Sequence, residues 1–164
     1  MDKEKKIRVL HVVGAMNRAG TETMLMNIYR NIDREKVQFD FISYSKEEAH
    51  YDNEIKSLGG KVIKLKELVN AIKENGPYEV VHAHTLFNSG IAMLAAKKCG
   101  IKNRIAHAHT TLDNSSSIAR KIYINGMRFL INKYSTKTLA CSREAGKYLF
   151  GEKEINKSKY SYFP

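Results

Sequence analysis

The chain of 164 residues is long enough for one domain with a buried core, and its 43% hydrophobic and 27% charged residues are typical of a folded globular protein. Its formal net charge of +11 favours anionic partners such as phosphorylated ligands or anionic lipid. Nucleic acid is not predicted as a partner, because no helix-turn-helix, RRM or zinc signature accompanies this charge.

The two cysteines, Cys99 and Cys141, stand far apart, which argues against a zinc site and against a disulfide framework. Reduced thiols fit a cytoplasmic location. No stretch approaches the ~20 consecutive apolar residues that cross a bilayer. We therefore expect the protein to meet a membrane only as a peripheral protein, at its inner face.

Residues 7–13 form a short apolar run that is typical of a central parallel strand, and Gly14 ends it. Gly20 precedes an amphipathic helix that extends to residue 32, with Thr21 as its expected N-cap. A strand that enters a helix through a glycine loop places backbone N–H groups where open α/β sheets bind ligands, often phosphate. A turn glycine in an ordinary α/β unit is the alternative explanation.

Further stretches of apolar and β-forming residues are predicted as strands: 37–44, 61–65, 78–84, 104–108, 136–140 and 159–163. Helices are predicted between them: 52–58, 66–74, 88–99, 118–134 and 142–150. Gly100 should close one helix, Ser142 should cap another, and Asn88 or Ser89 should cap a third. In the longest helix one stripe should face the core: Ala119, Tyr123, Met127, Leu130 and Tyr134. A polar loop is expected over 109–117.

This alternation of strands and helices with short loops predicts an α/β fold with a doubly wound, mainly parallel sheet and helices on both of its faces. The expected strand order is the Rossmann-like 3-2-1-4-5-6. A flavodoxin-like order is the alternative.

Polar residues follow three strands that should be neighbours, so they should meet at the carboxyl edge of the sheet. They are Asn17, Arg18, Gly20 and Thr21 after the first strand; His84 and Asn88 after a second; and His109 and Thr110 after a third. Two His-Ala-His triplets, 82–84 and 107–109, each place both histidines on one face of a strand.

Four such histidines could ligate a metal, but neither triplet contains a carboxylate or thiolate, so we predict no metal site. His82 and His107 are expected in the core. His84 and His109 are expected at the mouth, where a neutral imidazole can orient a substrate or transfer a proton. The sequence contains no G-x-S-x-G elbow, no Walker A motif and no G-x-G-x-x-G, which argues against a serine hydrolase, a P-loop enzyme and a nicotinamide site.

Several stretches together resemble the family 4 retaining glycosyltransferases. The opening IRVLHVVGAMNRAGTETMLMNI is similar to that family's first strand, loop and helix, whose G-G-x-E is A-G-T-E at 19–22 here. YEVVHAHTLFNSGIAMLAAKKCGI resembles the D-V-V-H-x-H segment with its helix, and RIAHAHT the strand that leads to an active-site histidine. TLACSREAGKYLFG resembles the V-S-E strand and helix, and KYSYFP the strand before the interdomain linker.

The resemblance implies that residues 1–164 are the N-terminal, acceptor-side domain of a two-domain GT-B enzyme, with the C-terminal donor-binding domain outside this chain. Such an enzyme moves a sugar, with retention, from a nucleotide-diphosphate sugar to a glycan or lipid-linked acceptor in polysaccharide synthesis. It carries no bound cofactor or metal. The chain alone is expected to be inactive.

By the same resemblance, His109 would face the transferred sugar, and a donor-diphosphate loop would comprise Ala19, Gly20 and Thr21. Ala19 stands where the family usually has glycine, which affects how closely the loop can approach a ligand. Residues expected to line the cleft or the acceptor site are Asn17, Arg18, His84, Asn88 and Thr110. The alternative function is a non-catalytic Rossmann-like module that binds a nucleotide or a partner.

Overall fold

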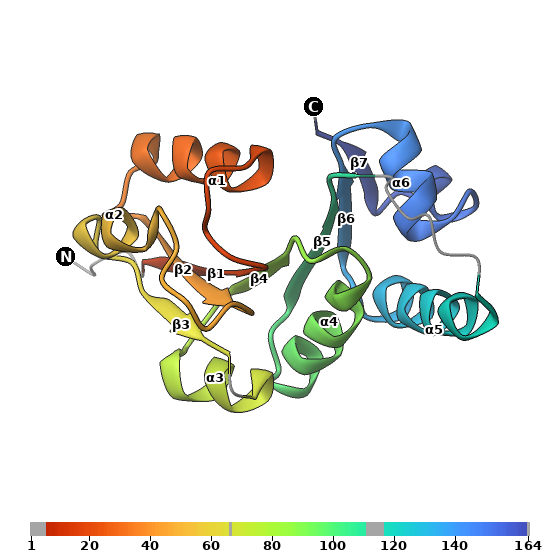
Figure 1. Ribbon diagram of the computed structural model, residues 1–164, viewed down its shortest axis with the longest axis horizontal. Coiled ribbons are helices and arrows are strands. Elements are labelled where there is room, and N and C mark those ends of the chain that lie inside the picture. Colours follow the sequence, from red (N-terminus) through yellow and green to blue (C-terminus); the bar gives the residue numbers. More distant parts are fainter. Residues whose placement is uncertain (1–5, 66, 111–116, 164) are drawn as a thin grey trace.

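Seven parallel strands form one twisted sheet in the computed structural model, which describes residues 6–65, 67–110 and 117–163 (Figure 1). The strands are β1 (Ile7–Val13), β2 (Val37–Ser43), β3 (Val62–Lys64), β4 (Val80–Ala83), β5 (Asn103–Ala108), β6 (Lys137–Ala140) and β7 (Tyr160–Tyr162). Their order is β3-β2-β1-β4-β5-β6-β7, and every neighbouring pair is parallel. The Rossmann-like order is confirmed, with β7 added beside β6, and the flavodoxin-like order is wrong.

Helices cover both faces of this sheet, as predicted. They are α1 (Gly20–Asn31), α2 (Asp52–Ser57), α3 (Leu68–Asn75), α4 (Ser89–Lys98), α5 (Ile118–Tyr134) and α6 (Arg143–Phe150), with 3₁₀ turns η1 (Leu86–Asn88) and η2 (Glu154–Asn156). Figure 1 shows α1 and α2 on one face and α3, α4 and α5 on the other. The expected start of a helix at residue 66 and most of the expected loop 109–117 lie outside the described residues. Within the part of the chain that the structure describes, no helix is long and apolar enough to cross a membrane.

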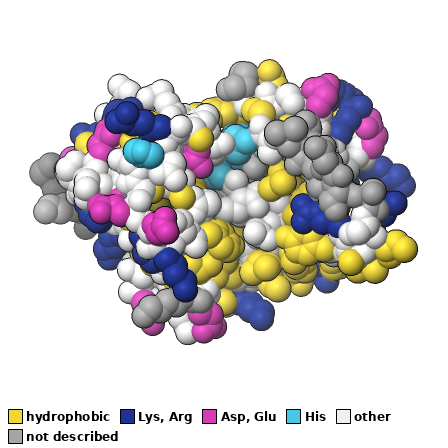
Figure 2. Space-filling model, in the orientation of Figure 1, with side chains coloured by type: hydrophobic (Ala, Val, Ile, Leu, Met, Phe, Trp, Pro, Cys, Tyr) yellow, Lys and Arg dark blue, Asp and Glu magenta, His cyan; other side chains and the backbone are white. Residues whose placement is uncertain are grey.

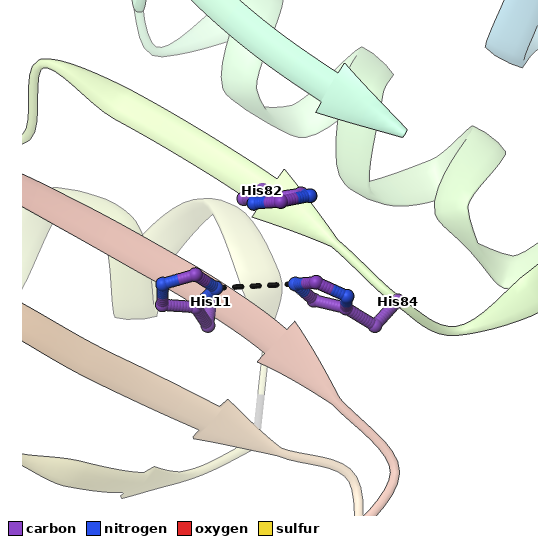
Figure 3. Close-up of side chains that lie close together, drawn as sticks. All are labelled: His11, His82 and His84. Atoms are coloured by element: carbon purple, nitrogen blue, oxygen red, sulfur yellow. Dashed lines mark hydrogen bonds between the residues drawn. The ribbon is translucent and has the colours of Figure 1, made fainter. Parts of the chain in front are cut away.

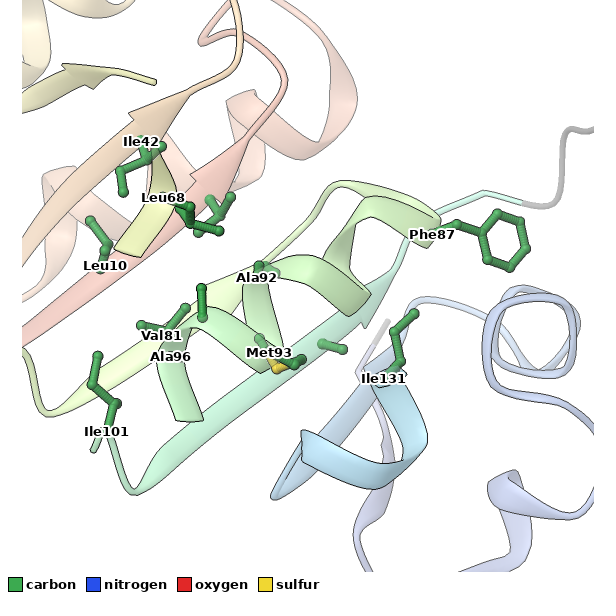
Figure 4. Close-up of a cluster of buried hydrophobic side chains, with 14 of the residues drawn as sticks. Leu10, Ile42, Leu68, Val81, Phe87, Ala92, Met93, Ala96, Ile101 and Ile131 are labelled. Carbon is green, nitrogen blue, oxygen red and sulfur yellow. The ribbon is translucent and has the colours of Figure 1, made fainter. Parts of the chain in front are cut away.

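The alternation of side chains along β1 divides the core between the two faces of the sheet. Leu10 and Val12, both fully buried, point into a core formed with α3 to α6, part of which Figure 4 shows. Val13, equally buried, belongs to a second core with α1 and α2 that contains Leu25 and Phe41. Since each fully buried side chain of this kind contributes roughly 1.5–3 kcal/mol, β1 stabilises both cores.

Helices α4 and α5 pack closely because Gly90 has no side chain. A Cβ at this position would lie 2.8 Å from the carbonyl oxygen of Met127 and 3.2 Å from the Cβ of Leu130. The polar side of α5 meets the last turn of α6, where Arg128 donates to the carbonyl oxygens of Tyr148 (2.7 Å) and Leu149 (3.3 Å). Helix α5 is therefore fixed on two sides by α4 and α6.

The third side of α5 is an exposed apolar face, which the sequence did not predict. Ile118, Ile122 and Phe129 are 78%, 69% and 59% exposed, whereas only Ile131 in this helix is fully buried. Ala119 was expected in the core and is exposed. The expected core stripe is otherwise at least partly buried, at Tyr123, Met127, Leu130 and Tyr134.

The predicted helix caps have mixed outcomes. Ser142 caps α6 by accepting from the backbone N–H of Ala145 at 3.0 Å, and Gly100 follows α4 with a φ of +75°, both as predicted. The prediction for Thr21 is wrong, because the N-cap lies two residues earlier, at Ala19, and α1 begins at Gly20. Asn88 occupies the N-cap position of α4 without a side-chain bond to the helix.

Candidate functional site

A cavity of about 560 Å³ lies at the carboxyl edge of the sheet, between the first turn of α1 and the segments that follow β4 and β5. Its lining residues are Ala19, Gly20, Thr21, Glu22, Met24, His84, Leu86, His109, Thr110 and Cys141. In open α/β sheets this edge, near the point where the strand order reverses, is where ligands bind. Six of the residues singled out in the sequence therefore meet in one cavity: Ala19, Gly20, Thr21, His84, His109 and Thr110.

One wall of the cavity is the positive end of α1. The first turn of a helix offers backbone N–H groups that have no partner within the helix, and its dipole favours an anion there. A Cβ at Gly20 would meet no atom within 4 Å, so the packing of the chain itself does not require glycine at this position. Burial raises the pKa of the Glu22 carboxyl, whose own backbone N–H acts in the opposite direction. These N–H groups and the helix dipole would stabilise a bound anion when Glu22 is protonated or turned away from it.

The opposite wall belongs to a row of five imidazoles, which we call the histidine row: His11, His82, His84, His107 and His109. His11 lies in β1 directly opposite His82 in β4, and the other three follow on the same face of the sheet. Successive rings are close, with centroid distances from 4.0 Å (His107 to His109) to 5.5 Å (His84 to His107). The row runs from the second core to the cavity, where His84 and His109 form part of the lining.

Hydrogen bonds join three members of the row in single file. Nδ1 of His11 lies 3.1 Å from Nε2 of His84, as Figure 3 shows, and Nδ1 of His84 lies 2.9 Å from Nε2 of His109. His84 thus uses both of its ring nitrogens within the row. Several other buried nitrogens have no hydrogen-bond partner: Nε2 of His11, Nε2 of His82 and both ring nitrogens of His107.

Burial keeps the histidine row uncharged. It lowers the pKa of His11 to about 3, of His107 to about 2 and of His109 to about 4. Burial likewise lowers the pKa values of His82 and His84 well below the usual range, and neighbouring histidines add to this shift. Near neutral pH every imidazole of the row therefore has one N–H donor and one acceptor nitrogen.

Two sets of three histidines have ligand atoms within 4.8 Å of one another and could hold a metal ion: His11, His82 and His84, and His84, His107 and His109. Metal-ligating imidazoles normally donate their second N–H to a carboxylate, a carbonyl or water. The second nitrogens of His11 and His107 have no such partner, and neither set includes a carboxylate or thiolate. The row therefore fits a hydrogen-bonded chain better than a metal centre.

The sequence between residues 18 and 164 matches the family model of Glycosyltransferase Family 4. The chain belongs to glycosyltransferase family 4. It is 39% identical, over 96% of its length, to the Putative glycosyltransferase EpsF of Bacillus subtilis strain 168. It is 29% identical, over 90% of its length, to the Capsular polysaccharide biosynthesis glycosyltransferase CapH of Staphylococcus aureus. The family 4 chain spans 44% of the length of each of these relatives.

The fold agrees with this assignment. The crystal structure of Anabaena Alr3699/HepE in complex with UDP-glucose superposes with a TM-score of 0.70 at 11% sequence identity, covering 95% of this chain and 43% of that one. The complex of the same protein with UDP gives a TM-score of 0.68 at 12% identity. The predicted Rossmann-like half of a GT-B fold is thereby confirmed.

Three predicted site residues of this family 4 chain lie outside the cavity lining. The Oδ1 of Asn17 accepts from the backbone N–H of His50 at 3.3 Å and lies 2.8 Å from its Nδ1. Arg18 is exposed, and its charge helps lower the pKa of Glu54, after the larger effect of Arg30. Asn88 accepts from the hydroxyl of Tyr123 at 2.6 Å.

Sequence reasoning missed His11, which completes the histidine row, and four residues of the lining: Glu22, Met24, Leu86 and Cys141. A signal for His11 did exist, because it alternates with Leu10 and Val12 and must point to the opposite face of β1. The register of β1 against β4, which places it beside His84, is a property of the folded sheet.

Proposed function

We propose that the whole protein transfers a sugar, with retention, from a nucleotide-diphosphate sugar to a glycan or lipid-linked acceptor in polysaccharide synthesis. Residues 1–164 supply the N-terminal, acceptor-side domain, and a C-terminal donor-binding domain outside this chain completes the site. One observation carries the proposal: in a family 4 chain, the positive end of α1 faces His109 across a cavity at the carboxyl edge of the sheet. The names of EpsF and CapH and the UDP-glucose in HepE support it.

In the proposed reaction the bond between the anomeric carbon and the diphosphate oxygen breaks, and a bond to an acceptor hydroxyl oxygen forms. The hydroxyl proton leaves with the diphosphate. Negative charge grows on that leaving group, and the N–H groups of the first turn of α1 stabilise it. Gly20 lets the diphosphate approach the backbone, and His109 contacts the transferred sugar.

Other lining residues have supporting roles in this proposal. Ala19 and Thr21 flank the diphosphate, and His84 and Thr110 line the sugar side of the cavity. Asn17, Arg18 and Asn88 act only on a ligand that extends beyond the cavity. No resident metal is needed, because the helix end supplies the positive potential.

The proposal is tested with the intact protein, a panel of nucleotide sugars that begins with UDP-glucose, and a lipid-linked acceptor extract. Release of nucleoside diphosphate is followed for the unaltered protein, for His109→Ala and for the control His50→Ala. We expect release from one donor, also in EDTA, and a loss of at least about tenfold in His109→Ala alone. Lack of release from every donor by a folded protein would favour the non-catalytic binding module.

The second part of the proposal is that the protein binds an anionic membrane surface through helix α5 and reaches its acceptor there. Helix α5 contains four cations (Arg120, Lys121, Arg128 and Lys133) and no carboxylate, and its exposed face carries Ile118, Ile122 and Phe129. Figure 2 shows hydrophobic side chains beside Lys and Arg on the side of the molecule where α4 and α5 lie. Apolar side chains flanked by cations suit a helix that lies in the headgroup region of an anionic leaflet.

Vesicle flotation tests this surface. We expect the intact protein to float with vesicles that contain phosphatidylglycerol and to stay below with pure phosphatidylcholine. The double variant Ile122→Ser, Phe129→Ser should lose about tenfold in binding, whereas Ile7→Ser, at an exposed site away from α5, should bind normally. Equal binding of both variants would contradict the role of α5.

A further inference from the structure

The most unusual feature of the cavity wall is that His109 does not stand alone. Its Nε2 is hydrogen-bonded to Nδ1 of His84. The Nε2 of His84 is in turn hydrogen-bonded to Nδ1 of His11, which is 2% exposed. Three imidazoles therefore share two hydrogen bonds, and the last of them lines the cavity. The direction of these two bonds decides which ring nitrogen of His109 carries its proton.

A neutral imidazole has one N–H and one lone-pair nitrogen, so two neighbouring rings can bond only if one donates and the other accepts. The donor-to-acceptor direction must therefore be the same in both hydrogen bonds. In one direction, His11 donates from Nδ1 and its buried Nε2 carries only a lone pair. In the other direction, the Nε2 of His11 would be a buried N–H without an acceptor. Unpaired buried N–H groups are the rarer of the two defects in proteins, which favours the first direction.

We propose that His11 and His84 are positioning residues that hold His109 in one tautomer: Nε2 accepts from Nδ1–H of His84, and Nδ1–H of His109 is the group left for a ligand. His109 then acts as a neutral hydrogen-bond donor. It is not a general base, because its lone pair is already occupied.

The chemistry of the cavity agrees with a donor at this point. Oxygen atoms of a sugar hydroxyl or of a diphosphate accept hydrogen bonds, and α1 presents further N–H donors on the opposite wall. The pKa of His109, lowered by burial to about 4, means that it donates without carrying a charge. This choice of ligand rests on the proposed function, whereas the tautomer itself rests only on the histidine row.

The tautomer is measured directly by long-range proton–nitrogen correlation NMR on the intact protein, labelled with ¹⁵N at histidine, without any sugar nucleotide at pH 7.5. Single histidine variants assign the signals. We expect Nδ1–H for His109 and for His84. A proton on Nε2 of His109, or a charged ring, would overturn the proposal. Since no donor sugar is present, this result is independent of whether the protein transfers sugar.

Variants of His84 test the positioning role. In His84→Leu, His109 should lose its fixed tautomer and shift towards Nε2–H. In His84→Gln, an amide NH₂ can still donate to His109 and an amide oxygen can still accept from His11, so Nδ1–H should persist. His50→Leu, outside the histidine row, is the control. The same tautomer of His109 in all three variants would contradict the proposal.

Kinetics with the donor found by the panel provides the second readout. We expect His84→Leu to lower kcat about tenfold with little change in KM, and His84→Gln to recover most of that loss. Equal losses in the two variants would reduce His84 to a packing role. If His84→Leu does not fold, the spectrum of the unaltered protein and the glutamine variant still decide the question.

Discussion

Two clusters of buried polar groups in the sheet, the ion pair of Arg8 with Asp40 and the histidine row, differ in how many of their atoms have hydrogen-bond partners. Asp40 is 1% exposed and pairs with Arg8, and it also accepts from the hydroxyl of Tyr78 (3.1 Å) and the backbone N–H of Lys61 (2.8 Å). Arg8 additionally donates to the carbonyl oxygen of Asn75 at 2.8 Å. The chain supplies every one of these partners itself.

The histidine row is uncharged, and it leaves buried nitrogens of His11, His82 and His107 without partners. Unpaired buried polar atoms cost free energy, so a fold does not leave them in place for stability. The Asp40 cluster is therefore satisfied within the chain, whereas the histidine row ends at a cavity lined by His84 and His109, where the proposed function places a ligand. Four measurements test this difference.

The largest effect should come from acid. Unfolded histidine has a pKa of about 6.5, and burial lowers that of His109 to about 4 and that of His11 to about 3. Below pH 6.5 the histidines of the row therefore bind protons in the unfolded chain but not in the folded one. The free energy of unfolding consequently falls as the pH falls. Each histidine of the row costs up to about 1.4 kcal/mol per pH unit in this window, and nothing above pH 7.

Urea denaturation of the intact protein between pH 7.5 and pH 5 measures this slope. His11→Phe, which places a phenyl ring beside Phe39 and Phe41, should reduce the slope by up to one proton. His50→Ala serves as the control outside the row. A free energy of unfolding that does not change with pH over this range would show that the row is not buried in the neutral form.

The next effect concerns the Asp40 cluster. Asp40→Ala leaves the Arg8 guanidinium without its partner and should lower the free energy of unfolding by about 3 kcal/mol. Glu54→Ala removes the carboxylate of the exposed Arg30–Glu54 pair and should cost no more than about 1 kcal/mol. Folded Asp40→Ala protein should turn over the donor at the normal rate. A loss of turnover in folded protein would show that Asp40 also acts in the reaction.

A smaller loss, of at least about tenfold in turnover, is expected for His109→Ala in the donor panel described above. The free energy of unfolding should change by less than in Asp40→Ala, because His109 lies at the cavity and is only partly buried. A His109→Ala variant with full turnover and a low free energy of unfolding would show that His109 stabilises the fold and takes no part in the reaction.

The smallest effect on stability should be that of Gly20→Ala. Its new methyl group meets no atom within 4 Å, so the free energy of unfolding should change by no more than about 0.5 kcal/mol. Under the proposed function the methyl group narrows the approach of the diphosphate to the backbone, so calorimetry should find UDP binding about tenfold weaker. Gly126→Ala is the matched control, because it also meets no atom but lies on α5, away from the cavity. Equal UDP binding by both variants would remove Gly20 from the donor site.

Much of the fold could be predicted because it rests on local patterns. The apolar run of 7–13 requires burial on both faces, and the repeated strand–helix units leave few ways to order a parallel sheet. Gly100 and Ser142 were predictable because each satisfies a helix end within a few residues. The N-cap prediction for Thr21 is wrong by two positions, because α1 begins at Gly20 with Ala19 as its N-cap.

The remaining features depend on contacts between distant segments. Asn17 turns towards His50 because residues 49–51 pack beside it, which its own loop does not reveal. His11 joins the histidine row through the register of β1 against β4. Ile122 and Phe129 are exposed because α4 and α6 contact the other sides of α5, and an apolar pattern alone does not tell which side is covered.

The central position of β1 also has a consequence for synthesis on the ribosome. Among the seven strands of the sheet β1 is made first, yet it lies inside the sheet between β2 and β4, and Glu79, which accepts from the backbone N–H of Arg8, follows 71 positions later. At about 5–20 residues per second, one side of β1 waits several seconds for β4. One side of this apolar strand therefore stays unpaired until β4 has been made.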